Sequence, residues 1–136
     1  MNDRERRNLE IIKEFRANAG VVGGMFEGTP LLLLTTTGAK SGIARTTPLA
    51  YLRDGDRVVV FAANGGRATH PGWYYNLLAG AWVTVEIGSE SYPATAVALT
   101  GAERARVWDL QVAANPSIAD FAATTDREIP VVALTR

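Results

Sequence analysis

Six short segments of the chain have the length and composition of β-strands, and turn residues separate them. They cover residues 31–37, 45–52, 57–63, 82–87, 92–99 and 129–134. Residues 82–87, WVTVEI, alternate between apolar and polar side chains, which is the period of a strand with one buried face. Asp54-Gly55 is a tight hairpin signal, and Pro93 suggests a strand edge or a bulge. Six such strands with hairpin-like links favour a mainly antiparallel β-barrel of the α+β class over a doubly wound sheet.

The first of the predicted helices spans about residues 3–18. Leu9, Ile12 and Phe15 recur at helical spacing among charged residues, and the pattern ends near Gly20. Packing of this amphipathic helix on its own domain is the favoured interpretation. A membrane surface or a partner protein remains open but is not favoured, since a basic amphipathic N-terminus can lie on lipid.

Three further helices are predicted at the periphery of the barrel. Pro71 starts a short helix, PGWYYNLLAG, because its missing N–H is not needed in the first turn. Thr100 and Glu103 resemble a capping box that opens a longer helix, which Asn115-Pro116 ends. Ser117 then caps a last short helix.

Length and composition bound the kind of protein. With 136 residues, 47% of them hydrophobic, the chain fits one domain over residues 1–136. Fourteen basic and fourteen acidic residues give no overall field to attract nucleic acid, so any anion site must be local. There is no cysteine and one histidine, which excludes thiolate chemistry and multi-His metal centres. No segment is apolar enough for a membrane span or a signal peptide, and we expect a cytoplasmic protein.

A glycine-flanked turn at residues 38–42, GAKSG, sets Lys40 and Ser41 close to Arg45. The pattern is not a nucleotide-binding P-loop, which needs glycines where this chain has Ala39 and Leu34. Its chemistry nevertheless suits phosphate, because the turn exposes backbone N–H groups and Arg45 presents a planar fork of donors. An ordinary solvated turn is the alternative on this pattern alone.

A second cluster, AANGGRATHPGWYYN at residues 62–76, joins adjacent glycines to aromatic residues on a short helix. Glycines let a flat ligand approach the backbone closely. The aromatic residues can form the wall of a planar ring site, although core packing explains them as well. His70 has no cysteine or serine nucleophile beside it, which argues against a hydrolase. An anion-binding turn and a glycine-rich aromatic loop together indicate a cofactor with a phosphorylated tail and a flat head.

In order and spacing, TTTGAKSG, RTTPL, DGDR, VFAANGG, HPGWYYNL and TDREIPVV resemble the deazaflavin (coenzyme F420)-dependent nitroreductase family of actinobacteria. The similarity runs from about Phe15 to the C-terminus. It implies a split β-barrel like the FMN-binding pyridoxamine-oxidase fold, with reduced F420 as hydride donor and a small electron acceptor as the partner. The cofactor-binding positions that it implies are Ala39, Lys40, Ser41, Arg45, Thr46, Thr47, Pro48 and Leu49 for the tail, and Ala62, Ala63, Asn64, Gly65, Gly72, Trp73 and Asn76 for the ring.

The chain departs from this family near its C-terminus. Members that reduce bicyclic nitroimidazoles carry three tyrosines that line the substrate pocket, where this chain has Asn115, Ile118 and Phe121. A more apolar pocket is therefore expected, for an enone, lactone, quinone or nitro compound that accepts a hydride. Tyr74 and Tyr75 are the candidate proton donors, with water as the alternative. A non-catalytic F420 carrier and an FMN-dependent oxidoreductase on the same fold are the competing functions.

Overall fold

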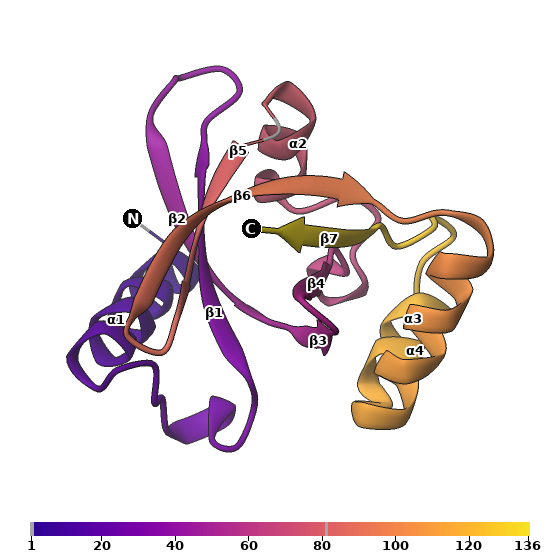
Figure 1. Ribbon diagram of the computed structural model, residues 1–136, viewed down its shortest axis with the longest axis horizontal. Coiled ribbons are helices and arrows are strands. Elements are labelled where there is room, and N and C mark those ends of the chain that lie inside the picture. Colours follow the sequence, from indigo (N-terminus) through magenta and orange to yellow (C-terminus); the bar gives the residue numbers. More distant parts are fainter. Residues whose placement is uncertain (1, 81) are drawn as a thin grey trace.

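The computed structural model describes residues 2–80 and 82–136, and in this part of the chain seven strands form one antiparallel sheet (Figure 1). The strands are β1 (Leu31–Thr37), β2 (Ala44–Ala50), β3 (Leu52–Asp54), β4 (Arg57–Phe61), β5 (Trp82–Ile87), β6 (Glu90–Ala98) and β7 (Val131–Thr135). Their order across the sheet is β2-β1-β5-β6-β7-β4-β3, and each neighbouring pair is antiparallel.

The sheet curls into a half-barrel because its two edge strands are consecutive in the chain. Tyr51 alone separates β2 from β3, and one residue spans at most about 3.6 Å. The backbone N–H of Tyr51 donates to the carbonyl of Pro30 at 3.2 Å, where the chain crosses from one edge to the other. The expected barrel is confirmed, but seven strands replace about six. The segment predicted as one strand, residues 45–52, divides at Tyr51 because Leu52 pairs with Val59 on β4.

Four helices lie where the sequence predicts them. They are α1 (Asp3–Ala17), α2 (Gly72–Ala79), α3 (Gly101–Ala114) and α4 (Ser117–Ala123), with 3-10 turns at Gly24–Phe26 and Asn64–Gly66. Gly20, just after α1, has φ +91° and approaches Gly88 so closely that a Cβ would lie 2.7 Å from the Gly88 Cα. A glycine is therefore required where the chain that follows α1 passes the turn between β5 and β6.

Two of the predicted helix caps are wrong. Thr100 is the N-cap of α3, but its side chain makes no capping bond, and the Glu103 carboxylate instead pairs with Arg57 at 3.3 Å. Pro116, not Ser117, is the N-cap of α4. The Asn115 side-chain oxygen accepts from the Ser117 hydroxyl at 2.6 Å, so Asn115 supplies the local bond instead. The Asn115 oxygen also accepts from the backbone N–H of Ser117 at 3.3 Å.

The core has a layer on each face of the sheet. The alternate residues Leu32 and Leu34 of β1 point inward and pack in the cluster that contains Trp73 of α2. Leu31 and Leu33 point outward against α1, and both are buried. β1 is therefore a continuous leucine run because both of its faces are covered. Pro93 lies at an edge, as predicted, because β6 pairs with β7 only from Thr95 onward.

Candidate functional site

Three adjoining cavities form one groove across β2, α2 and α1. Their volumes are about 540, 390 and 380 Å³. Arg45, Gly72 and Asn76 line both the first and the second cavity. Thr47 and Trp73 line both the second and the third. The groove thus runs from the 38–42 turn to the loop that follows β4, which are the two segments that the sequence marks as a ligand site.

The turn between β1 and β2 is held by its own backbone and by Ser41. The N–H of Gly38 donates to the carbonyl of Ile43 at 2.8 Å, and the N–H of Gly42 donates to the carbonyl of Gly38 at 2.9 Å. The Ser41 hydroxyl accepts from the N–H of Ile43 at 3.2 Å. Gly42 takes φ +70°, which the closure of the turn requires. Lys40 lies in this turn and lines the 540 Å³ cavity.

Asn76 joins the turn to α2. Its side-chain oxygen accepts from the N–H of Ala39 at 3.0 Å, and its side-chain nitrogen donates to the hydroxyl of Thr36 at 3.0 Å. Both ends of the amide are thereby engaged by protein groups. Asn76 therefore fixes the 38–42 turn against α2 at the edge of the groove.

β2 presents alternate residues to the groove. Arg45, Thr47 and Leu49 line it, with Pro48 beside Leu49. Thr46 lines none of the three cavities, and its hydroxyl instead lies 2.8 Å from that of Thr35 on β1. The two-residue period of a strand explains why Thr46 is separated from its neighbours.

The loop after β4 is organised by Arg127. This half-buried guanidinium donates to the carbonyls of Ala63 at 2.8 Å, Arg67 at 3.0 Å and Ala62 at 3.1 Å. β4 ends at Phe61, so Ala62 and Ala63 leave the strand earlier than the predicted 57–63. The chain then turns through three consecutive residues of positive φ, 64–66. Nothing in the sequence pattern pointed to Arg127, which lies about sixty residues away from the loop that it holds.

His70 contacts the same guanidinium. Its Nδ1 lies 2.9 Å from Arg127 Nη1, and because an arginine only donates, Nδ1 accepts and the neutral ring carries its proton on Nε2. Burial, and then the charge of Arg127, lower the pKa of His70 from its ordinary value of 6.5. Tyr74 packs against this ring in a tilted arrangement, with ring centroids 4.8 Å apart and an interplanar angle of 58°, and lines none of the groove cavities. Tyr75 is exposed and lines the Lys40 cavity.

The three positions expected in a substrate pocket lie apart. Asn115 lines a separate cavity of about 490 Å³, which Tyr51 at the junction of β2 and β3 also lines. Ile118 is buried, 5% exposed, against Ala63. Phe121 is partly exposed, and a Cβ on Gly66 would lie 3.2 Å from its carbonyl oxygen. α4 therefore touches the 64–66 loop, although Asn115, Ile118 and Phe121 do not share any of these cavities.

Helix α1 contributes a wall of the groove that the sequence reasoning missed. Arg4 and Asn8 line both the 390 and the 380 Å³ cavities, Glu5 lines the former, and Arg7 lines the latter. The amphipathic pattern did predict that one face of α1 packs on the domain, and buried Ile12 and Phe15 confirm it. For the opposite face of α1, the cluster of arginines in the first two turns was the sequence feature that could have indicated a ligand site.

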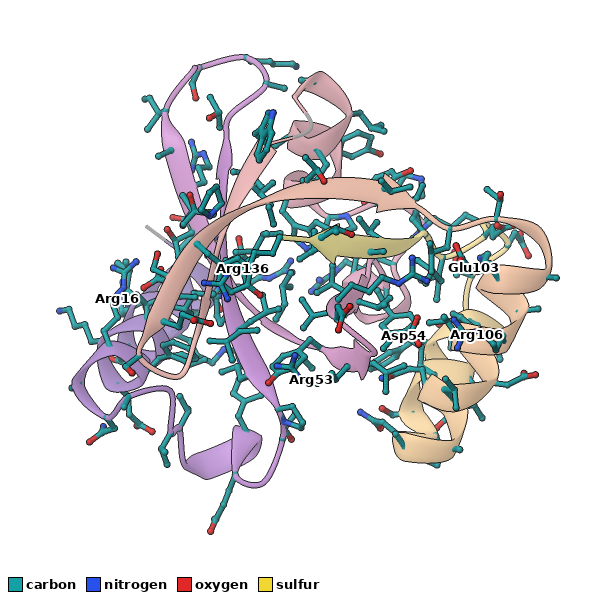
Figure 2. The ribbon with its side chains drawn as sticks, viewed as in Figure 1. Arg16, Arg53, Asp54, Glu103, Arg106 and Arg136 are labelled. Atoms are coloured by element: carbon teal, nitrogen blue, oxygen red, sulfur yellow. The ribbon has the colours of Figure 1, made fainter. Side chains whose placement is uncertain are left out.

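The cations of the groove differ from the others in their partners. Among the described residues, six arginines pair with carboxylates, namely Arg6, Arg16, Arg57, Arg104, Arg106 and Arg136. None of these lines the groove, and Arg16, Arg106 and Arg136 are labelled in Figure 2. Five cations do line it, and none has a carboxylate partner within ion-pair distance in the described chain: Arg4, Arg7, Lys40, Arg45 and Arg67. A chain of zero net charge thus carries a strongly positive groove.

Two kinds of site are not found in the described residues. No group of three or more histidine, aspartate or glutamate side chains is placed to hold a metal ion. Across residues 2–80 and 82–136, no helix is both long and apolar enough to cross a bilayer.

Comparisons with known proteins agree on one family. The model of the F420H2-dependent quinone reductases matches residues 7–136. A Mycobacterium tuberculosis protein named F420H2-dependent quinone reductase is 40% identical over 126 residues, which are 90% of this chain and 85% of that protein.

Two solved structures are similar over most of their length. One, described as the F420H2-dependent reductase FDR-A, is 42% identical with a TM-score of 0.71, and the match covers 77% of this chain and 93% of that one. The other, described as a domain-swapped dimer, is 39% identical with a TM-score of 0.73 over 97% of both chains.

Proposed function

The chain belongs to the F420H2-dependent quinone reductase family, and we propose on this premise that it binds F420 along the groove and reduces a quinone or another small electron-poor acceptor there. Family membership confirms the resemblance, the cofactor and the class of enzyme that the sequence indicated. It favours the reductase over the FMN enzyme and the F420 carrier, which are the two competing functions. The residues that hold the cofactor and the acceptor are the substance of the proposal.

The observation that carries the proposal is the charge of the groove. Five cations without carboxylate partners line a continuous hollow in a neutral chain. Such a surface suits an elongated polyanion, because each phosphate or carboxylate oxygen that enters gains charge-assisted hydrogen bonds. The resemblance ascribes to F420 a phosphodiester and a glutamate tail on a flat ring, so the donors at the Lys40 end of the groove suit that anionic tail.

We assign the tail to the Lys40 end of the groove. Lys40 is a mobile point charge, and Arg45 presents a planar fork to phosphate oxygens. Asn76 holds the turn that carries Lys40 against α2, through its bond to the N–H of Ala39. The protein therefore fixes the anchor before the ligand arrives, which lowers the entropic cost of binding.

We assign the ring to the loop after β4. The carbonyls of Ala62 and Ala63 are turned toward Arg127, and glycine at position 65 leaves room for a flat group against the backbone. When bound, reduced F420 supplies the hydride, as such cofactors carry the difficult chemistry themselves. The part of the protein is to hold the ring and the acceptor at reacting distance, and the apolar side chains of the 380 Å³ cavity offer a surface for both.

The acceptor that best fits is a quinone, which the family name also indicates. Nitroimidazole reduction is not expected, since asparagine, isoleucine and phenylalanine replace the three tyrosines at positions 115, 118 and 121. The cytoplasm remains the predicted compartment. Association of α1 with the membrane surface remains the alternative, and a lipid flotation assay with and without residues 1–20 tests it.

The test is a fluorescence titration of the purified protein with F420 and, in parallel, with FMN. Menadione, cyclohexenone and a nitroimidazole are then added separately to the complex with F420H2, while the visible absorbance of oxidised F420 is followed. We expect tight F420 binding and turnover of menadione. Binding without any turnover would support the carrier, and preference for FMN would contradict the assignment of the groove.

A further inference from the structure

Asn64 brings two arginines together at the inner end of the groove. Its side-chain oxygen accepts from Arg4 Nη2 at 3.2 Å and from Arg67 Nη1 at 3.3 Å. Its side-chain nitrogen donates to the carbonyl of Thr69 at 3.0 Å, so the orientation of the amide is fixed. Arg4 comes from α1 and Arg67 from the loop after β4, and the fold places them on a common acceptor although they lie sixty-three positions apart.

Among the described residues, no carboxylate lies within ion-pair distance of Arg4 or Arg67. A neutral amide oxygen satisfies hydrogen bonds but does not balance charge, and Arg7 lines the same 380 Å³ cavity. The acidic residue Glu5 lines the adjoining cavity, and its carboxylate accepts from the side chain of Asn2. Two guanidinium groups held this close to each other favour an anion between them.

Part of the wall of the same cavity is apolar. Leu49, Phe61 and Trp73 line it beside the two arginines, together with Ile11. A cavity that combines apolar side chains with cationic ones suits a flat carbon skeleton that carries an oxygen, and the ring loop Asn64–Gly65 also lines it. These are the features of a site for a quinone whose carbonyl oxygen faces the arginines.

We propose that Arg4 and Arg67 form an oxyanion site that binds a carbonyl oxygen of the quinone acceptor and stabilises the negative charge that this oxygen acquires on reduction. The inference rests on the proposed function. Hydride transfer from F420H2 supplies both electrons and one hydrogen to the quinone and leaves a hydroquinone monoanion. A proton from water then completes the hydroquinone, while the deazaflavin is oxidised and releases its remaining proton. Cations that are held beside this oxygen stabilise the negative charge that develops on it in the transition state.

A binding experiment tests the site without turnover. The probes are 2-hydroxy-1,4-naphthoquinone, which is an anion at neutral pH, and menadione, which is neutral and of similar shape. Calorimetry compares the wild type with Arg4→Gln, Arg67→Gln and the double variant. Lys13→Gln is the matched control, since Lys13 is an exposed cation on the same helix and lines none of the groove cavities. We expect the double variant to lose about tenfold or more in affinity for the anion and little for menadione. Equal losses for both probes, or no loss, would overturn the oxyanion site.

A kinetic experiment tests the role in reduction. At saturating F420H2, menadione is compared with methylene blue, a cation that becomes neutral on accepting a hydride. The double variant should lower kcat for menadione by about tenfold or more and leave methylene blue unchanged, because only menadione develops an anionic oxygen. An equal effect on both acceptors would refute the proposal. Weaker binding of F420 itself, measured without acceptor, would assign the arginines to the cofactor instead and also refute it.

The experiments distinguish failure of the proposed function from failure of the oxyanion site. If the wild type neither binds F420 nor reduces menadione, the proposed function is wrong, while preference for the anionic naphthoquinone still decides the oxyanion site. If the wild type reduces menadione and the double variant does so equally well, only the oxyanion site is wrong. Both arginines are exposed, and circular dichroism of each variant confirms that the fold is kept.

Discussion

Replacing Arg127 by alanine should loosen the loop that we assign to the ring of the cofactor. Its guanidinium donates to three carbonyls and to His70 Nδ1, at distances of 2.8 to 3.1 Å. Ala62 is fully buried and Ala63 is 8% exposed, so their carbonyls would lose a charged donor in a place that water reaches poorly. No other side chain among the described residues donates to these two carbonyls.

The expected loss of stability depends on the carbonyls that lose Arg127 as a hydrogen-bond donor. Each buried acceptor without a partner costs about 1–3 kcal/mol. The carbonyl of Ala62 loses its side-chain donor, whereas the carbonyl of Ala63 keeps its bond from the N–H of Gly66 at 2.9 Å. Since water also reaches the half-exposed side of Arg127, we expect the free energy of unfolding to fall by about 2 kcal/mol in Arg127→Ala. In Arg127→Lys the fall should be about half as large, since one ammonium reaches fewer of the four acceptors.

Urea unfolding followed by tryptophan fluorescence measures the stability, and F420 titration below the transition measures the site. Arg127→Ala should bind F420 at least about tenfold more weakly, because the loop no longer has one preferred conformation. A few millimolar guanidinium chloride should restore part of this affinity in the alanine variant and have no such effect on the lysine variant. A stability loss below about 1 kcal/mol together with unchanged F420 affinity would refute the account of the loop.

Three other changes have defined outcomes. Lys40→Gln with Arg45→Gln should weaken F420 binding by about 1.5–3 kcal/mol per charged hydrogen bond lost, without lowering the melting temperature, and unchanged affinity in a titration would contradict the tail site. Asn76→Leu frees the turn and should weaken F420 binding less than that double variant does, with greater protease sensitivity of the turn; equal resistance would exclude the positioning role. The lowered pKa of His70 means that the unfolded chain takes up its proton first as the pH falls below 6.5, so stability present at higher pH is lost in that window. His70→Gln should flatten this part of the stability profile in urea titrations from pH 7.5 to 5, and an unaltered slope would show that another group is responsible.

Much of the fold could be predicted because it depends on local patterns. Leucines at 31–34 and the alternation at 82–87 define strands whatever they pair with, and glycine after Asp54 closes a hairpin. The break at Tyr51 could not be predicted, since no glycine or proline marks it and only the pairing of Leu52 with Val59 reveals it. The failed cap at Thr100 has the same origin, because its box partner is drawn away by a distant arginine.

In the candidate site, too, residues that belong to local sequence patterns could be predicted, and residues that act through distant contacts could not. Short local patterns of the sequence were enough to predict the roles of Lys40, Arg45 and the glycines after Ala63. The contributions of Arg4 and Arg127 depend on contacts across sixty or more positions, with Asn64 and with the carbonyl of Ala63 respectively. Helical periodicity did not reveal the role of Arg4, because it predicts the buried face of α1 and assigns the opposite face to solvent.

The unpaired cations of the groove couple the stability of the protein to its ligand. With only water in the groove these like charges raise the free energy of the native state, and an anion that fills it removes part of that repulsion. Binding to the native state alone adds about 2.7 kcal/mol of stability when free ligand is at a hundred times its dissociation constant. The abundance of this enzyme in a cell would then follow the supply of its cofactor, because chains that fold without F420 spend more time open to proteases.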